Sequence, residues 1–228
     1  MFHHKKEVEQ MDEIRLQPEP VNEVLLRGTL LKAPEFSHEN HGKRFDRFTL
    51  SVQRLSGTYD HLEILADQAL TEGIGLLEGP MLEVRGEIRS FNNHSGQGRR
   101  LVITVYARSI VPWDGAPENQ VLLTGAVCRE PVYRHTPLGR EITDLMLAVS
   151  RKYRRRDYIP CILWGSVARM GADCPVGTVL RLQGRLQSRS YVKQTPEGPE
   201  ERIAYEVSAI TAAPADEHHG LAAGENLC

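Results

Sequence analysis

The sequence predicts an all-β protein built from two tandem five-stranded barrels, each with a short helix between its third and fourth strands. Three observations support this fold class. An internal repeat relates the two halves of the chain, short windows alternate apolar and polar residues, and turn-forming residues separate those windows. With 228 residues, the chain has room for two domains of about one hundred residues each.

The internal repeat is the strongest of these signals. Residues 22–28 (NEVLLRG) match residues 119–125 (NQVLLTG) at an offset of 97, and the same register continues without a gap. Over the 44 positions from 22 to 65, 12 residues are identical to their partners. Two unrelated β-rich segments rarely keep one register for so long, and we therefore interpret the halves as two copies of one domain.

The order along the chain follows from the repeat and from composition. We expect residues 1–20 to form a flexible, charged N-terminal arm, since they carry too little periodic apolar content to pack. Copy one then covers residues 21–112, a short linker covers 113–118, and copy two covers 119–212. The tail, 213–228, is rich in alanine, glycine and charge and is predicted to be disordered.

Copy two shows the strand pattern most clearly. Alternating windows predict strands at about 119–129, 140–151, 158–164, 178–188 and 201–211. Proline and glycine turns separate them, and residues 166–172 are predicted to form a short helix with Ser166 as its N-cap. Five strands with a helix between the third and fourth are the plan of an OB-fold barrel.

Two glycines recur at equivalent places inside the predicted strands. Gly125 and Gly184 fall in the first and fourth strands of copy two, as Gly28 and Gly86 do in copy one. Glycine weakens a flat strand but permits the sharp coiling that closes a small barrel. Their recurrence therefore favours closed barrels in both copies.

The charge is distributed unevenly, although the formal net charge is only -2. Residues 119–212 carry 14 Lys and Arg against 9 Asp and Glu, whereas residues 22–112 carry 11 against 11. The local charge, rather than the total, decides what a surface attracts. Copy two is thus the better candidate for an anionic partner.

The cysteines and the termini indicate a cytoplasmic protein. Cys128, Cys161, Cys174 and Cys228 show no CxxC spacing, which predicts reduced thiols without structural disulfides or a zinc site. No apolar run reaches the roughly 18 residues of a membrane span, and residues 1–20 lack the apolar core of a signal peptide. We therefore expect no membrane association.

A basic hairpin tip, residues 151–156, lies between the second and third predicted strands of copy two. Its cations surround Tyr153, and Tyr158 and Trp164 follow on the third strand. Cations track phosphates and flat rings stack on bases, which is what a binder of unpaired nucleic acid requires. Taken alone, such a tip can equally be an ordinary solvated turn.

Copy two resembles the bacterial single-stranded DNA-binding protein (SSB) family. The resemblance rests on fragments in order along nearly all of residues 119–211: Asn119-x-Val121-x-Leu123-x-Gly125, Pro131 with Gly139, 147–151 (LAVSR), 159–165 (IPCILWG) with Ala168, and 184–191 (GRLQSRSY). The related primosomal replication protein N is similar as well, with a likeness in residues 127–129 (VCR). The resemblance implies tandem OB-folds.

The resemblance also implies roles for individual residues. In the family, bases stack on four aromatic positions, which correspond here to Tyr153, Tyr158, Trp164 and Tyr191. The cations expected to contact phosphates beside them are Arg151, Lys152, Arg154, Arg155, Arg156, Arg185 and Arg189. For each ring, packing in the barrel or on its surface is the competing interpretation, most of all for Trp164.

Copy one departs from this pattern. Ser56 and His61 stand at the positions of Tyr153 and Tyr158, and the Trp164 position falls at Asp67. Tyr59 and Phe91 are the aromatic residues left near the expected face. We interpret copy one as a barrel whose binding face is degenerate.

The predicted function is sequence-tolerant binding of single-stranded DNA, in replication, repair or recombination, without enzymatic activity, cofactor or metal. Neither a phosphate-cradling glycine loop nor a Ser/His/Asp arrangement is recognisable in the sequence. Two alternatives stay open: an interaction protein of a primosome-like or plasmid replication complex, and a binder of single-stranded RNA, because stacking and phosphate contacts do not read the 2′-hydroxyl.

The resemblance also bears on partners. Family members with one barrel per chain usually act as tetramers, which implies a homodimer with four OB-folds for this chain. The family commonly ends in an acidic tip closing with Pro-Phe that recruits replication proteins. Residues 224–228 (GENLC) lack it, and such recruitment is therefore in doubt.

Overall fold

The computed structural model describes residues 21–72, 79–93, 101–195 and 198–215. Copy one contains β1 (Asn22–Leu30), β2 (Glu35–Asn40), β3 (Lys43–Gln53), β4 (Tyr59–Asp67), α2 (Gln68–Glu72), β5 (Met81–Asn92) and β6 (Leu101–Pro112). Copy two contains β7 (Glu118–Val127), β8 (Val132–His135), β9 (Glu141–Ser150), the 3-10 turn η1 (Lys152–Arg154), β10 (Arg156–Trp164), α3 (Ser166–Ala172), β11 (Val179–Thr195) and β12 (Gly198–Pro214).

Each copy closes into the predicted OB-fold barrel. In copy one, β1 pairs with both β3 and β5, and a parallel pairing of β4 with β6 completes the closure. In copy two, β7 pairs with β9 and β11, and β10 pairs in parallel with β12. The helices α2 and α3 follow the third barrel strand of each copy, as predicted.

Two short strands were not predicted. β2 and β8 pair antiparallel with β3 and β9 and lie at the two ends of the sheet order. The turn between β2 and β3 places His41 and Gly42 at positive φ, and Gly139 has positive φ before β9. These tight turns fold the preceding segment back, and it adds a strand outside the five-stranded plan.

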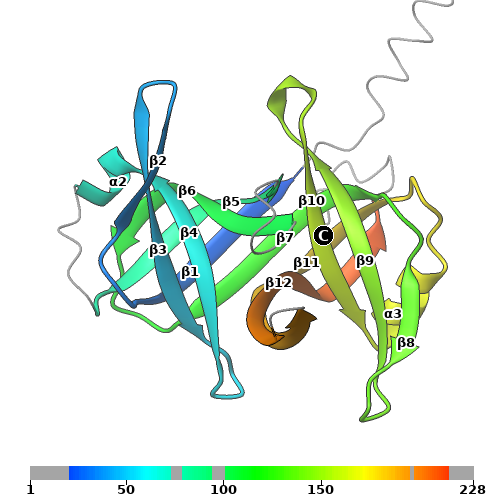
Figure 1. The fold of residues 1–228 in the computed structure, drawn as a ribbon. Coiled ribbons are helices and arrows are strands. Elements are labelled where there is room, and N and C mark those ends of the chain that lie inside the picture. Colours follow the sequence, from blue (N-terminus) through cyan, green and yellow to red (C-terminus); the bar gives the residue numbers. More distant parts are fainter. Residues whose placement is uncertain (1–20, 73–78, 94–100, 196–197, 216–228) are drawn as a thin grey trace, which may run out of the picture.

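The two barrels form one continuous sheet. β1 pairs antiparallel with β7 from Asn22↔Leu123 to Arg27↔Glu118, which joins the copies into a 12-stranded sheet. Figure 1 shows the barrels side by side, with the β3–β4 and β9–β10 hairpins extending to opposite ends of the molecule. The copies are therefore related by an approximate twofold axis through the β1–β7 pairing.

The core follows the strand alternation. In β1 and β7, Val24, Leu26, Val121 and Leu123 are buried, while the residues between them, Leu25 and Leu122, are only half-buried. The buried residues of both copies belong to one cluster. Burial of an aliphatic side chain stabilises a fold by about 1.5–3 kcal/mol, so this joint core favours a single rigid unit.

Gly86 and Gly184 mark the bends of the fourth barrel strands. The register of β5 with β6 shifts between Arg85 and Gly86, and that of β11 with β12 shifts between Gln183 and Gly184. A Cβ at either glycine would collide with the backbone oxygen of Tyr106 or Ser208. The structure confirms the prediction that these glycines permit coiling.

Three details differ from the predictions. The residue preceding α3 is Gly165, with φ of 58°, and no side chain caps the helix, so Ser166 is not its N-cap. β11 and β12 extend into a long hairpin because they continue to pair beyond the barrel, as far as Thr195↔Gly198. β12 runs to Pro214, which places two residues of the predicted tail in a strand. The predicted arm, 1–20, and residues 216–228 lie outside the described residues.

Within the described ranges, neither helix is long and apolar enough to cross a membrane.

Candidate nucleic-acid interface

Strand β10 carries two of the predicted stacking residues on one face. Ile159, Cys161 and Leu163 are buried in the barrel, so Tyr158 and Trp164 point to the opposite side of the strand. Six residues of strand separate them by roughly 20 Å, a span of several nucleotides of extended single strand. Both rings are thus placed on the outside of the barrel wall.

Trp164 is half-buried and held in position. Its indole Nε1 donates a hydrogen bond to Ser208 Oγ at 3.0 Å, from β10 to the neighbouring β12. Ser208 is itself buried, which gives this contact a fixed anchor. Trp164 therefore presents the rest of its ring from a defined position.

Trp164 forms part of a cleft of about 630 Å³, which we call the Trp164 cleft. Its walls come mainly from β10, β11 and β12, with one arginine from copy one: Arg54, Arg140, Trp164, Arg185, Gln187, Ser188, Arg189, Ser208, Ala209 and Ile210. Four guanidinium groups and an indole converge there, and no carboxylate is among the lining residues. Such a lining favours an anionic ligand that also offers a flat ring.

Sequence reasoning missed Arg54 and Arg140 in this cleft. Both positions carry a cation in each copy, because Arg54 aligns with Arg151 and Lys43 aligns with Arg140 at the same offset of 97. That recurrence was the available signal for Arg140. The contribution of Arg54 to copy two depends on the packing of the two barrels.

Arg189 and Tyr191 continue the surface along β11. The Arg189 guanidinium lies 5.8 Å from the centroid of the Tyr191 ring, and its Nε lies 3.7 Å from Glu206 Oε1. Tyr191 pairs with Arg202 in the long β11–β12 hairpin. Two residues predicted separately for the site, Arg189 and Tyr191, therefore lie next to each other on β11.

The basic tip, residues 151–156, projects from the β9–β10 hairpin. Tyr153 is 92% exposed at this tip. Lys152, Arg154, Arg155 and Arg156 are exposed too, and among the described residues they make no ion pair. Arg151 differs, since its Nε lies 3.4 Å from the buried carboxylate of Asp157.

The backbone of the tip is unusual for the residues it carries. Tyr153 and Arg154 have φ of 61° and 55°, in the left-handed region that non-glycine residues seldom adopt. In copy one, the position equivalent to Arg154 is Gly57, with φ of 85°. Copy two thus holds an arginine where the same turn accepts glycine, which points to a use for that side chain.

A second and larger cleft, of about 1250 Å³, lies between the basic tip and the strands near the β1–β7 pairing; we call it the tip cleft. Copy two contributes Tyr153 together with Arg151, Lys152 and Arg155. Copy one contributes Arg85, Arg89 and Arg108, which sequence reasoning did not single out. These three are ion-paired with Glu83, with Glu87 and Asp157, and with Glu87, respectively.

Tyr158 lies where the two copies meet. Its backbone N–H donates to Ser90 Oγ of copy one at 2.7 Å, and its side chain is 43% exposed. Next to it, Asp157 accepts a hydrogen bond from Ser90 N at 2.7 Å. The third barrel strand of copy two is thus fastened to copy one beside a predicted stacking residue.

The structure therefore divides the predicted site. Trp164, Arg185 and Arg189 share the Trp164 cleft, while Arg151, Lys152, Tyr153 and Arg155 share the tip cleft. Tyr158, Tyr191, Arg154 and Arg156 line neither cleft and are accessible on the same copy.

The three cysteines that the structure describes, Cys128, Cys161 and Cys174, offer no alternative site. Burial raises the pKa of Cys161, and it also raises the pKa of Cys128 and of Cys174. A thiol with a raised pKa is a poor nucleophile and a poor metal ligand at neutral pH. The described part of the chain contains no group of three or more potential metal ligands.

Comparison with solved structures supports the fold. The wild-type single-stranded DNA binding protein from Thermus aquaticus superimposes with a TM-score of 0.72 at 23% sequence identity, over 91% of this chain and 98% of the other. At that identity, the likeness concerns the architecture of two joined barrels.

Comparison with known sequences concerns copy two. The model of the Single-strand binding protein family matches residues 118–213. Single-stranded DNA-binding protein B of Bacillus subtilis (strain 168) is 35% identical over 80 residues, which cover 32% of this chain and 71% of that protein. Single-stranded DNA-binding protein 1 of Lactococcus lactis subsp. lactis is 32% identical over 83 residues, and the chain spans 55% of its length.

Three findings agree on the family. One relative is matched over more than two thirds of its length, the family model matches copy two, and the fold consists of two joined barrels. The chain belongs to the single-strand binding protein family.

Proposed function

We propose that this protein binds single-stranded DNA with little sequence preference, by base stacking and phosphate contacts, and serves DNA replication, repair or recombination as a binding protein rather than as an enzyme. The observation that supports the proposal best is the Trp164 cleft, where an anchored indole lies among four arginines without a lining carboxylate. Rings accept any base, and guanidinium groups accept any phosphate.

The basic tip supports the same proposal. Four of its cations make no ion pair among the described residues, which leaves them available to phosphates. Tyr153 offers a nearly fully exposed ring among them. We assign Tyr153, Tyr158, Trp164 and Tyr191 as stacking residues and the seven cations predicted above as phosphate contacts.

The test is a titration of intrinsic tryptophan fluorescence with oligo-dT at several salt concentrations. Counterion release from single strands contributes a slope of about -0.7 per phosphate contact, so five contacts give a slope of roughly -3 for log K against log salt. A binding constant that does not depend on salt would overturn the proposal.

Two further titrations separate the alternatives. Duplex DNA should bind far more weakly, because its bases are stacked internally and cannot reach the rings. Oligo-rU that binds much more tightly than oligo-dT would assign the same surface to RNA instead.

A further inference from the structure

Arg185, on β11, is a half-buried cation without an ion pair among the described residues. Within the described ranges, its guanidinium makes one hydrogen bond, and that bond is long, at 3.4 Å from Nη2 to Gln187 Oε1. Burial lowers the pKa of Arg185, and the neighbouring Arg54 lowers it further, against an opposing effect of Asp60. The folded protein thus keeps a positive charge at a place where its own environment disfavours it, as functional sites often do.

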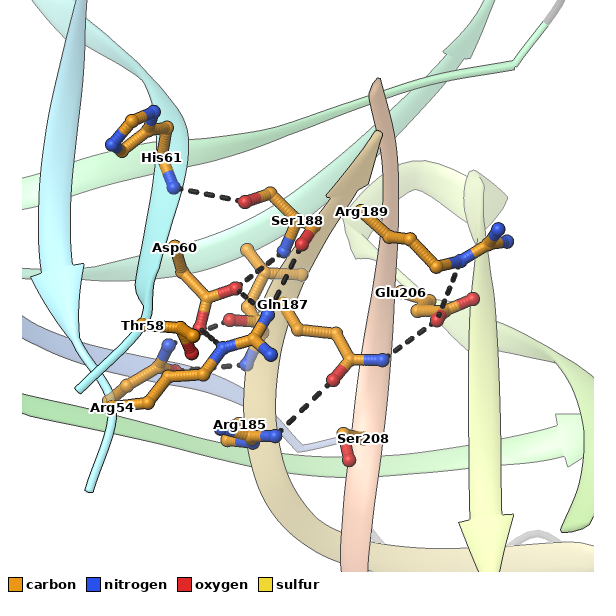
Figure 2. Close-up of polar contacts among 12 residues, drawn as sticks. Arg54, Thr58, Asp60, His61, Arg185, Gln187, Ser188, Arg189, Glu206 and Ser208 are labelled. Atoms are coloured by element: carbon orange, nitrogen blue, oxygen red, sulfur yellow. Dashed lines mark hydrogen bonds and ion pairs between the residues drawn. The ribbon is translucent and has the colours of Figure 1, made fainter. Parts of the chain in front are cut away.

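The neighbour Arg54 comes from the other copy. Asp60 holds its guanidinium, with Nε 2.8 Å from Oδ2, and Nη2 also donates to the Ser188 carbonyl on β11 at 3.2 Å. Figure 2 shows Arg54 and Asp60 reaching from copy one to Ser188, with Arg185 beside them. The packing of the barrels therefore brings two cations together at this contact between the copies. We call such a contact, where the third barrel strand of one copy meets the fourth barrel strand of the other, a seam.

The carboxylates nearest to the seam are already engaged. Asp60 accepts hydrogen bonds from Arg54 and from Ser188 N, the latter at 2.7 Å. Glu206 accepts one from Gln187 Nε2 at 2.7 Å and also faces Arg189 (Figure 2). Neither carboxylate lines the Trp164 cleft, whereas Arg54 and Arg185 do.

The internal repeat supplies a natural comparison, because the approximate twofold axis creates the same seam a second time. There, Arg151, Asp157 and Ser90 take the places of Arg54, Asp60 and Ser188, and Asp157 again accepts from Ser90 N. Glu87 stands at the position of Arg185, and it is ion-paired with Arg89 and Arg108. The same barrel contact is therefore built with a carboxylate at this position, and the fold does not require Arg185.

We propose that the seam formed by Arg54 and Arg185 is a phosphate subsite. These two arginines together bind one phosphodiester of a single strand, and the base next to that phosphodiester stacks on Trp164. This inference rests on the proposed function and extends it. Copy one then contributes directly to binding by copy two, although it lacks the stacking rings.

Arg185→Gln tests the subsite, and Arg181→Gln is its matched control. Arg181 lies on the same strand and the same face, four residues away, and it is exposed and outside the cleft. Loss of a hydrogen-bonded charge contact should weaken oligo-dT binding by Arg185→Gln roughly tenfold or more. The slope of log K against log salt should become shallower by about 0.7, while the control keeps the wild-type affinity and slope.

Thermal unfolding distinguishes binding from folding. Because Arg185 is repelled by Arg54, and because its one hydrogen bond to another described residue is long, Arg185→Gln should leave the melting temperature unchanged or raise it. A variant that binds like wild type, or a control that loses as much as Arg185→Gln, would overturn the subsite while the proposed function stands. Failure of the wild-type protein itself to bind oligo-dT would overturn both.

A double-mutant cycle tests whether the two arginines share one phosphate. Arg54→Lys keeps a cation for Asp60 but loses the planar fork that also reaches Ser188. If one phosphate bridges both groups, the loss of affinity in the double variant should be smaller than the sum of the two single losses in free energy. Additive losses would show that the arginines contact separate phosphates and would contradict the shared site.

Discussion

At the scale of single residues, Trp164 should contribute most clearly to binding. Stacking on an aromatic side chain is worth about 1–3 kcal/mol per base, so Trp164→Ala should weaken oligo-dT binding roughly 5- to 100-fold. Trp164→Phe keeps a ring and should lose less. Tyr59→Ala and Phe91→Ala, in copy one, should change the affinity far less, and equal losses there would contradict the assignment of stacking to copy two.

The protein contains two tryptophans, which gives this prediction a spectroscopic control. Trp113 lies outside both clefts, with the Arg27 guanidinium 3.7 Å from its ring centroid and its Nε1 donating to the Ala116 carbonyl. Fluorescence quenching by oligo-dT should therefore persist in Trp113→Phe and disappear in Trp164→Phe. A melting curve of each variant is needed, since half-buried Trp164 also contacts Ser208.

Substitution of Arg154 by glycine should affect DNA binding without reducing the stability of the fold. Its φ of 55° costs a non-glycine residue about 1–2 kcal/mol, and the equivalent Gly57 adopts this region freely. Arg154→Gly relieves this strain in the folded state but also increases the conformational entropy of the unfolded chain, so it should not lower the free energy of unfolding. It should nevertheless weaken DNA binding, because it removes an exposed cation. Arg154→Val would be the contrasting variant, because a β-branched residue is strained at positive φ. Urea unfolding and an oligo-dT titration of both variants check this, and a destabilised glycine variant would contradict it.

At the scale of elements, two equivalent carboxylates fasten the third barrel strand of each copy to the other copy. Asp60 and Asp157 are 1% and 0% exposed, and each accepts a backbone N–H from across the seam, of Ser188 and of Ser90. Each also faces an arginine at the end of its own hairpin, Arg54 or Arg151. The repeated Arg and Asp therefore hold the barrels together in addition to the β1–β7 pairing.

Removal of either carboxylate should destabilise the whole protein. Asp60→Ala or Asp157→Ala loses charged hydrogen bonds and leaves a partly buried arginine unpaired, at a cost on the order of 3 kcal/mol. Exposed Asp114, in the segment between the copies, is the control, and Asp114→Ala should change stability by no more than about 0.5 kcal/mol. Denaturant unfolding measures all three, and a change below 1 kcal/mol in both seam variants would argue against this role.

At the scale of the whole molecule, we predict a homodimer. The antiparallel pairing that joins β1 to β7 uses strand edges of both copies within one chain, and the edges left at the ends of the sheet order are the short strands β2 and β8. Two such chains give four barrels, the number implied by the family resemblance. Light scattering at micromolar concentration should report about twice the 25.7 kDa of one chain, and a mass near 25.7 kDa would contradict the prediction.

The two barrels, their order, and the copy that carries the predicted stacking rings and the basic tip could all be predicted from the amino-acid sequence. Apolar alternation depends on local periodicity, and the ungapped repeat fixes the same plan twice, so both signals can be read without a structure. The glycines at 86 and 184 were predictable for the same reason, because a strand bend needs a small residue at one position.

The contact between the two copies, and the cleft that this contact helps to form, could not be predicted from the sequence, because they depend on how the barrels pack. Arg54 and Ser188 are separated by 134 residues, and their contact depends on how one barrel is turned against the other. No periodicity encodes that rotation, since it results from the β1–β7 pairing and the buried carboxylates acting together. For this reason the sequence assigned copy one a degenerate face, whereas the folded chain places an arginine of copy one in the Trp164 cleft of copy two.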